Sequence, residues 1–316
     1  MKHMELSQLR IVFMGTPEFA VATLQILHEA GCHIVGVVTA PDKPAGRGLT
    51  LQQSAVKQYA VQMGMKVLQP LKLKDPAFLE ELSGLKADLQ IVVAFRMLPE
   101  VVWKMPPMGT VNLHGSLLPQ YRGAAPINWA IINGEVYTGV STFQLKHEID
   151  TGDMLLQEKI DIQPEDNAGT LHDKMKEIGA QLMLKTVNGL ADGALKKISQ
   201  ETMIGQSTDT LKHAPKIFTE TCEINWSLPG QTICNLIRGL SPYPAAFTYL
   251  NGKRLKIFEA HFTEERIPKN LIGQPKSDHK TFLHFNCMNG MIAIEDLQLE
   301  GKKRMKTADF LRGYKE

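Results

Sequence analysis

The segment "LRIVFMGTPEFAVATLQILHEAG", residues 9–31, indicates how the chain folds at its start. Its first seven residues are apolar except for Arg10, which is typical of a strand buried on both faces. Apolar residues then recur at helical spacing up to Gly31, and Pro17 takes the first helical position, where its missing N–H costs no hydrogen bond. A buried strand that leads directly into an amphipathic helix is typical of an α/β protein.

The same alternation of strand and helix continues along the first two thirds of the chain. Strands that alternate with helices predict a doubly wound, mostly parallel sheet. Two further segments with alternating polarity favour an antiparallel pair of strands at one edge of that sheet. The expected strands are 33–39, 66–68, 87–95, 109–114, 138–146 and 153–162, and the expected helices are 52–63, 75–82, 126–134 and 167–190.

The pattern changes after about residue 200. Residues 205–217 are polar and lack strong periodicity, which is typical of a linker. Beyond them, short strand-like segments are separated by Gly, Pro and Asn turns, as in a small β-barrel. We therefore expect an α/β domain at 1–204, a linker at 205–217 and a small β-domain at 218–316.

Composition places the chain among ordinary globular proteins, with 43% hydrophobic and 22% charged residues in 316. No apolar stretch is long enough to span a bilayer, so we expect no membrane association. The four cysteines lie far apart, which favours buried thiols in a reducing cytoplasm over disulfides or a zinc site. Residues 1–205 carry a net charge of −2 and residues 206–316 carry +4. The basic second part either binds a polyanion or is a solvated surface.

The segment "NLHGSLLPQYRGAAP", residues 112–126, follows an apolar strand. Asn112 and His114 are two residues apart, so on a strand both side chains point to the same side. In open parallel sheets, ligands bind beyond the carboxyl ends of the strands, where these two residues are expected. The turn "DTGD" offers Asp150 or Asp153 as a carboxylate that would orient His114 and favour its protonated form. The alternative is that these are turn and packing residues.

The usual nucleotide and hydrolase motifs are missing from the sequence. It contains no GxGxxG, no GxxxxGK[ST], no GxSxG and no HExxH. The segment "PDKPAGRG", residues 41–48, is a Pro- and Gly-rich loop that carries Lys43 and Arg47. Such a loop is either a clamp for a phosphate backbone or a solvated connection between elements.

Five segments taken together resemble one family. They are "IVFMGTPEFA" (11–20), "PDKPAGRG" (41–48), "NLHGSLLPQYRGAAPI" (112–127), "DTGDML" (150–155) and "INWS" (224–227). Their order and spacing are similar to those of the bacterial methionyl-tRNA formyltransferases over nearly the whole chain.

The resemblance implies a Rossmann-like formyltransferase fold followed by an OB-fold-like domain that helps to hold tRNA. It implies transfer of the formyl group of 10-formyltetrahydrofolate to the amino group of methionine on initiator tRNA, without a metal. The family's catalytic Asn, His and Asp fall on Asn112, His114 and Asp150. Its folate contacts fall on its SLLP motif, which is Ser116, Leu117, Leu118 and Pro119 here.

One departure and two alternatives accompany this interpretation. Arg96 stands where the family commonly has Gly, in a segment that is one residue shorter, which leaves the details of pterin binding open.

A formyltransferase with another acceptor, such as a sugar nucleotide, or a formyltetrahydrofolate hydrolase would share the same three residues. A non-catalytic nucleic-acid-binding module is the third possibility. We expect a cytoplasmic monomer that uses tRNA, with Lys43 and Arg47 in contact with the tRNA.

Overall fold

The computed structural model describes residues 5–45, 50–205 and 210–313. The chain forms two compact units, each built from segments that are separated in sequence. The first consists of Met1–Arg122, Gly139–Ile160 and Asp173–Lys212, and the second of Gly123–Thr138, Asp161–His172 and His213–Glu316. Segments 123–138 and 161–172, which precede the expected linker, therefore belong to the second unit.

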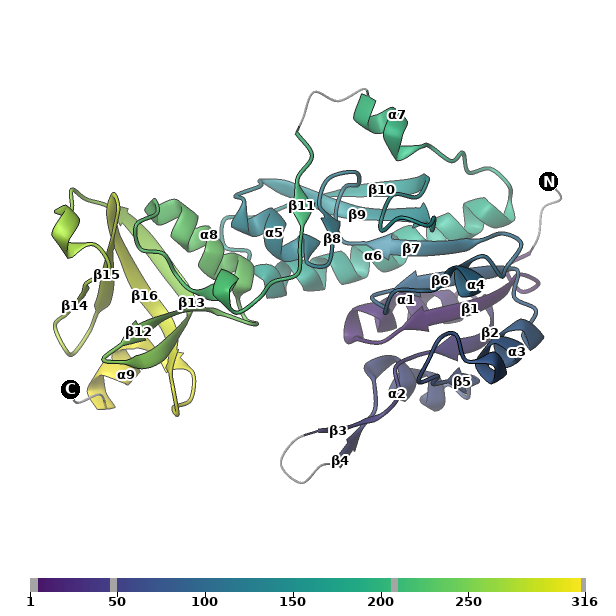
Figure 1. Cartoon of the computed structure of the whole chain (residues 1–316), viewed down its shortest axis with the longest axis horizontal. Coiled ribbons are helices and arrows are strands. Elements are labelled where there is room, and N and C mark those ends of the chain that lie inside the picture. The colour runs from purple at the N-terminus through teal and green to yellow at the C-terminus, as the bar shows by residue number, and fades with distance from the viewer. Residues whose placement is uncertain (1–4, 46–49, 206–209, 314–316) are drawn as a thin grey trace. The chain divides into compact units, whose positions relative to one another are not determined.

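The first unit contains a sheet in which seven described strands follow the order β10-β9-β7-β6-β1-β2-β5 (Figure 1). The pairs β1–β2, β1–β6, β2–β5 and β6–β7 are parallel, and β9 is antiparallel to β7. The expected mostly parallel α/β fold is confirmed. The strands are β1 (Arg10–Gly15), β2 (His33–Val38), β5 (Val67–Leu68), β6 (Leu89–Val93), β7 (Thr110–His114), β9 (Tyr137–Gln144) and β10 (Met154–Asp161).

Helices cover both faces of this sheet (Figure 1). On one face, Met14 and Val92 of the sheet pack in one apolar cluster with Leu82 of α3. On the other face, a Cβ added at Gly179 of α6 would lie 2.8 Å from Leu113 of β7, so the helix backbone approaches the sheet closely. The helices are α1 (Glu18–Glu29), α2 (Ala55–Gln62), α3 (Pro76–Gly84), α4 (Glu100–Trp103), α6 (Ala168–Ala191) and α7 (Gln200–Gly205).

A short hairpin, which is not predicted by the sequence pattern, interrupts this alternation. Strands β3 (Lys43–Ala45) and β4 (Thr50–Gln52) pair in antiparallel fashion. The residue before the hairpin, Asp42, accepts hydrogen bonds from Lys57 Nζ at 2.5 Å and Gln69 Nε2 at 2.8 Å. The base of the hairpin is thus fixed to α2 and to the residue that follows β5.

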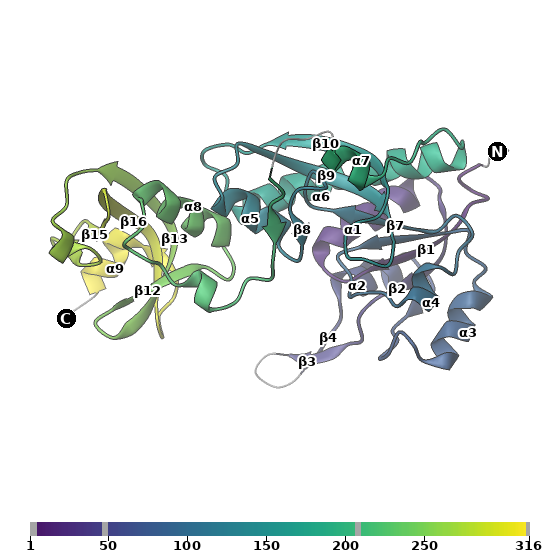
Figure 2. The ribbon, with the colours of Figure 1, turned by 45° about the horizontal axis from the view of Figure 1, so that its top comes forward.

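The second unit contains a curled antiparallel sheet with the order β12-β13-β16-β15-β14, with β17 paired to β16 among the described residues (Figure 2). It confirms a small C-terminal β-domain, which has the form of a half-barrel. Its elements are α5 (Pro126–Ile132), α8 (Gly230–Leu240), β12 (Ala246–Leu250), β13 (Lys253–Glu264), β14 (Pro275–Ser277), β15 (Leu283–Cys287), β16 (Gly290–Leu299), β17 (Met305–Lys306) and α9 (Thr307–Gly313), with short pieces β11 (His213–Ala214), η1 (Glu220–Cys222) and η2 (Lys269–Leu271). The two-residue strand β8 (Arg122–Gly123) pairs with β11.

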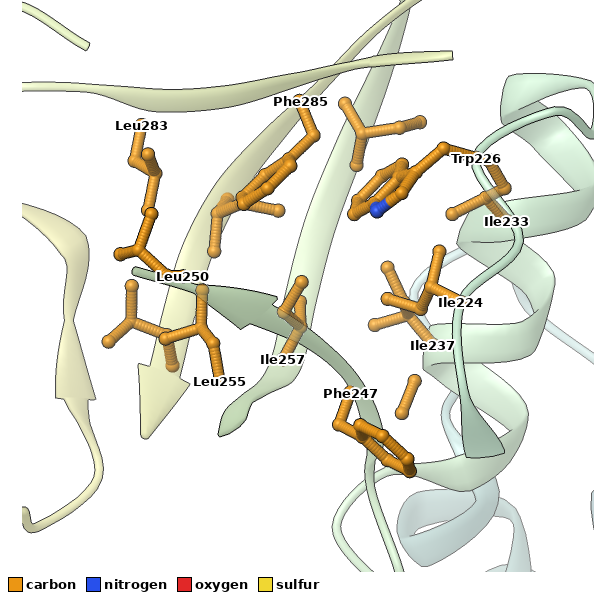
Figure 3. Close-up of a cluster of buried hydrophobic side chains, with 14 of the residues drawn as sticks. Ile224, Trp226, Ile233, Ile237, Phe247, Leu250, Leu255, Ile257, Leu283 and Phe285 are labelled. Atoms are coloured by element: carbon orange, nitrogen blue, oxygen red, sulfur yellow. The ribbon is translucent and has the colours of Figure 1, made fainter. Parts of the chain in front are cut away.

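The core of the second unit lies between α8 and the curled sheet (Figure 3). Helix α8 contributes Ile233 and Ile237, and its apolar residues recur at helical spacing, so the helix could have been predicted from the sequence. The "INWS" segment supplies Trp226, whose ring stacks on Phe285 at 4.6 Å between centroids. Trp226 Nε1 donates to Thr248 Oγ1 at 3.0 Å, so this motif residue is a core residue of the second unit.

All four cysteines are buried and free. Burial raises the pKa of the Cys32 and Cys234 thiols to about 11, and a thiol with such a pKa is a weak nucleophile at neutral pH. No helix among the described residues is long and apolar enough to cross a membrane.

Candidate active site

Strand β7 carries Asn112 and His114 to the carboxyl edge of the parallel sheet. Asn112 lies beside Val92 of β6 and Phe143 of β9, and His114 is the last residue of β7. His114 is buried, with 6% of its surface exposed, whereas Asn112 is partly exposed. The two side chains therefore share one face of the sheet at the edge where ligands bind in such folds.

The ring of His114 is held on two sides. Its Nε2 atom lies 2.9 Å from the carbonyl oxygen of Tyr121, and its ring meets Phe143 edge to face at 6.4 Å between centroids. Because a carbonyl oxygen can only accept, Nε2 is the donor and carries a hydrogen. The nitrogen that is left to face a substrate or a carboxylate is Nδ1.

Asp150 is the carboxylate that faces this nitrogen. Its Oδ2 atom lies 3.9 Å from His114 Nδ1. Asp153, the other acid of the "DTGD" turn, binds Lys146 Nζ at 2.7 Å instead. The structure therefore decides between the two acids that the sequence left open. Asp150 has a left-handed backbone with φ of +55°, a conformation that Asp adopts more readily than most residues.

Gly152 allows the turn that carries Asp150 to lie against the end of β9. A Cβ added at this position would come within 1.7 Å of the carbonyl oxygen of Gln144. Gln144 N also donates to Asp153 O at 2.9 Å, so the turn is joined to β9 through the backbone. No side chain fits at residue 152 without moving this turn.

The amide of Asn112 has no hydrogen-bond partner within residues 5–45, 50–205 and 210–313. Its NH₂ group is thus available to donate to a ligand beside the His114–Asp150 pair. Such a preorganised donor is the kind of group that stabilises a developing oxyanion.

The SLLP turn is fixed by hydrogen bonds of its own atoms and of side chains from β9 and β10. Ser116 Oγ donates to Gln120 O at 2.6 Å, and Ser141 Oγ donates to Ser116 O at 2.6 Å. Ser116 and Leu118 are fully buried, with 0% and 1% exposed. The side chains of Leu117 and Pro119 keep accessible surface, so a ligand can reach these two and not the other two without rearrangement.

Arg96 joins two loops at the same edge of the sheet. Its guanidinium donates to the carbonyl oxygens of Pro70 and Leu71, the second at 3.0 Å. Burial lowers the pKa of this guanidinium. The loop after β6 is therefore tied to the loop after β5, whereas a Gly at residue 96 would leave both carbonyls without this donor.

Of the two residues expected to contact tRNA, the structure describes one. Lys43 is exposed at the start of the β3–β4 hairpin, and Arg47 lies outside the described residues. Within the described parts of the chain, no group of three or more His, Cys, Asp or Glu side chains is placed to hold a metal ion.

Two family models match almost the whole chain in sequence. "Formyl transferase" matches residues 9–187, and "Formyl transferase, C-terminal domain" matches residues 216–315. The chain belongs to the formyl transferase family. The residues described above, from Asn112 to Asp153, fall within the first of these models.

Curated relatives of the family match from end to end. A methionyl-tRNA formyltransferase of Parabacteroides distasonis is 54% identical, over 99% of this chain and 98% of its own. One from Phocaeicola vulgatus is 55% identical over the same shares.

Two solved structures share the fold at lower identity. An N-formyltransferase from Helicobacter canadensis, in complex with folinic acid and dTDP-3-aminofucose, is 20% identical with a TM-score of 0.67, over 93% of this chain and 99% of its own. HypX from Aquifex aeolicus, in complex with tetrahydrofolic acid, is 20% identical with a TM-score of 0.65, over all of this chain and 49% of its own.

Three residues at the site were not found from the sequence. Tyr121 supplies the carbonyl that holds His114, and Arg122 and Gln200 are hydrogen-bonded to each other beside the Asp150 turn. Tyr121 and Arg122 lie within the segment 112–126 that carries Asn112 and His114, but nothing in their residue type indicates these contacts. Gln200 lies just before the expected linker and carries no motif at all.

Proposed function

We propose that this protein is a methionyl-tRNA formyltransferase, which moves the formyl group of 10-formyltetrahydrofolate to the amino group of methionine on initiator tRNA. The observation that carries this proposal is the amide of Asn112, which has no hydrogen-bond partner among the residues that the structure describes. It lies at the carboxyl edge of the sheet beside His114 and Asp150, whose Nδ1 and Oδ2 atoms are 3.9 Å apart. Relatives with this name and more than half of their residues identical support the choice of acceptor.

The first role is stabilisation of negative charge. In formyl transfer, the amine attacks the formyl carbon and charge builds on the formyl oxygen. The Asn112 NH₂ donates to that oxygen from a fixed strand position, and one such donor contributes about 3–4 kcal/mol to catalysis. No other group need move at the moment of reaction.

The second role is proton transfer. The attacking amine forms a new C–N bond and must lose a proton, while the donor nitrogen leaves the formyl carbon and must gain one. His114 Nδ1 and Asp150 together accept and return this proton, directly or through a water molecule. The bond from Nε2 to Tyr121 O keeps the ring from turning, so Nδ1 stays directed at the reacting atoms.

We assign folate binding to the SLLP turn. Leu117 and Pro119 offer accessible apolar surface, while Ser116 and Leu118 hold the turn in shape from inside. Gln157 Nε2 donates to Leu118 O at 2.7 Å and fixes the backbone of the turn to β10. The donor is used up as a second substrate in each turnover, and no metal takes part in this scheme.

Binding of the tRNA falls to two basic regions. Lys43 of the hairpin and Arg47 of the "PDKPAGRG" segment contact phosphates, as do cations of the C-terminal domain, since residues 206–316 carry a net charge of +4. We assign 1–204 to the catalytic domain, 205–217 to the linker and 218–316 to the tRNA-binding domain. We further propose that the protein acts as a monomer in the cytoplasm.

One assay tests the function. The protein is incubated with 10-formyltetrahydrofolate and methionyl-tRNA, and formylmethionine is measured after release from the tRNA. Asn112→Ala is the matched inactive control. Formylation of methionyl-tRNA by the wild type supports the proposal. Formylation of an amino-sugar nucleotide and not of the tRNA, or release of formate without an acceptor, would instead support the alternative enzymes.

A further inference from the structure

We propose that Gln200 is a positioning residue for the catalytic pair, because its side-chain amide fixes the backbone that presents Asp150 and, through Arg122, the backbone that holds His114. This inference rests on the proposed formyl transfer. It adds to the reaction a residue that lies in none of the sequence motifs described above.

The NH₂ group of the Gln200 side chain binds the turn that carries Asp150. Gln200 Nε2 donates to Asp150 O at 2.9 Å and to Gly152 O at 2.8 Å. Gln200 is 1% exposed, so both bonds are shielded from water. Two carbonyls of one tight turn thus depend on a single NH₂ group.

The carbonyl oxygen of the same side chain binds Arg122. Arg122 Nε and Nη2 donate to Gln200 Oε1 at 3.0 and 2.6 Å. Because a guanidinium only donates and a carbonyl only accepts, the amide can take only one of its two orientations here. Every polar atom of the Gln200 side chain is therefore committed.

Arg122 connects this arrangement to the other member of the pair. It directly follows Tyr121, whose carbonyl oxygen accepts from His114 Nε2. Tyr121 and Asp150 both have left-handed backbones, with φ of +58° and +55°, which are uncommon for residues other than Gly and are held by surrounding contacts. Gln200 thus links the two unusual backbone positions that orient the histidine and the carboxylate.

The position of Gln200 is itself fixed. Ile198 and Met154 exchange backbone hydrogen bonds of 2.8 and 3.0 Å, which attach this segment to the start of β10. On α7, Met203 packs against a cluster of Leu118, Phe143 and Met154 behind the site. The amide is held in place before any substrate binds.

The substitution Gln200→Glu tests the role most sharply. A glutamate keeps an oxygen for Arg122 but places a second acceptor against the carbonyls of Asp150 and Gly152. We expect kcat to fall at least about tenfold, since displacement of a catalytic group by about 1 Å can cost about 100-fold in rate. We expect the KM values for both substrates to change by no more than about twofold, because the residue acts through the catalytic pair and not through either substrate.

Gln90→Ala is the matched control. Gln90 is another buried glutamine of the first unit, and its Oε1 accepts from Thr110 at the start of β7, at the end of that strand away from Asn112 and His114. Its loss should lower the melting temperature and leave kcat within about twofold of the wild type. Combining Gln200→Ala with Arg122→Ala should cost no more in kcat than the larger of the two single losses, since both act through one network.

Three results would overturn the inference. The first is a folded Gln200→Glu protein with wild-type kcat. The second is a Gln90→Ala protein that has the same melting temperature as the Gln200→Glu protein and loses as much kcat. The third is a loss of kcat in the Arg122–Gln200 double variant that equals the sum of the two single losses. If the wild type formylates nothing, the proposed function fails, and a crystal structure of Gln200→Ala tests the positioning alone. An unchanged His114–Asp150 distance there would refute it, and a displaced Asp150 turn would support it.

Discussion

His114 Nδ1 lies 3.9 Å from Asp150 Oδ2, while the opposite ring nitrogen is bonded to the carbonyl of Tyr121. This relationship gives the ring a fixed direction and gives Nδ1 a charged neighbour beyond ordinary hydrogen-bond length. The separation leaves the pair able to tighten, or to share a proton with a substrate, when the site is filled.

Replacing the two strand residues should separate chemistry from folding. Asn112→Ala removes the amide donor and should lower kcat by about 100- to 1000-fold, because one preorganised donor to an oxyanion is worth that much. His114→Ala should lower kcat at least as far. Initial rates with methionyl-tRNA measure both effects, and circular dichroism checks the fold. Near wild-type turnover in either variant would remove that residue from the mechanism.

Asp150→Asn should lower kcat strongly and leave the fold intact. Asn tolerates the left-handed backbone at this position, so the substitution changes the charge and little else. Asp150→Ala removes the charge and also a side chain suited to that conformation, so it should be less stable than Asp150→Asn while equally inactive. Rates and thermal melts of the two variants provide the comparison. An active Asp150→Asn protein would show that the carboxylate takes no part.

Gly152→Ala should damage both stability and activity. The added Cβ would meet the Gln144 carbonyl at 1.7 Å, so the turn must shift, at a cost of about 1–3 kcal/mol in unfolding free energy. Gly84→Ala is the control, because nothing lies within 4 Å of its Cβ at the end of α3 and Ala is the better helix former. Denaturant unfolding and initial rates distinguish the two. Equal behaviour of both variants would contradict the tight turn.

The Asp42 carboxylate at the base of the β3–β4 hairpin should make the free energy of unfolding depend on pH in the acid range. Hydrogen bonds from Lys57 and Gln69 lower the pKa of Asp42 below its ordinary value of 3.8. A carboxylate with a lowered pKa in the folded state stabilises the fold above its ordinary pKa, and this contribution is lost as pH falls through the lowered value. Asp42→Asn should therefore flatten the fall in unfolding free energy below about pH 4.

The lysine partner gives the control for this profile. Lys57→Gln should reduce the same acid-side slope, and adding Asp42→Asn to it should change the slope little further. Denaturant unfolding across the acid range measures the slopes. A double variant whose profile is the sum of the two single changes would place the pH dependence elsewhere.

The C-terminal domain should contribute to tRNA binding through exposed cations. Lys302 and Lys303 are adjacent and exposed, and neither forms an ion pair with a residue that the structure describes. Lys302→Gln with Lys303→Gln should reduce the slope of log affinity against log salt by up to about 2, at about 0.9 for each phosphate contact. Filter binding at several salt concentrations measures it. Lys196 and Lys197 are two exposed lysines of the first unit, and the double variant Lys196→Gln with Lys197→Gln is the control. If it reduces the salt slope equally, the C-terminal domain has no special role in tRNA binding.

Several features could be predicted from the sequence because they depend on neighbours along the chain. The apolar run at 9–15 and the helical spacing after it determined the first strand and helix, with the helix starting at Glu18 directly after Pro17. The two-residue spacing of Asn112 and His114 put both on one face of β7. The sequence pattern did not predict five other elements: the hairpin of β3 and β4 and the helices α4, α7, α8 and α9. Most of them are too short to show a clear periodicity, and α8 is set among segments that resemble strands.

The sequence by itself determined the α/β order, the face on which Asn112 and His114 lie, and the presence of an acid in the "DTGD" turn, because these follow from local periodicity and residue type. Only the tertiary structure decided that Asp150 and not Asp153 faces the histidine, that Nδ1 is its open nitrogen, and that Gln200 binds the turn. These outcomes depend on contacts between residues far apart in the chain. Such contacts, hydrogen bonds above all, form only where packing brings the partners together, and no local pattern records that distance.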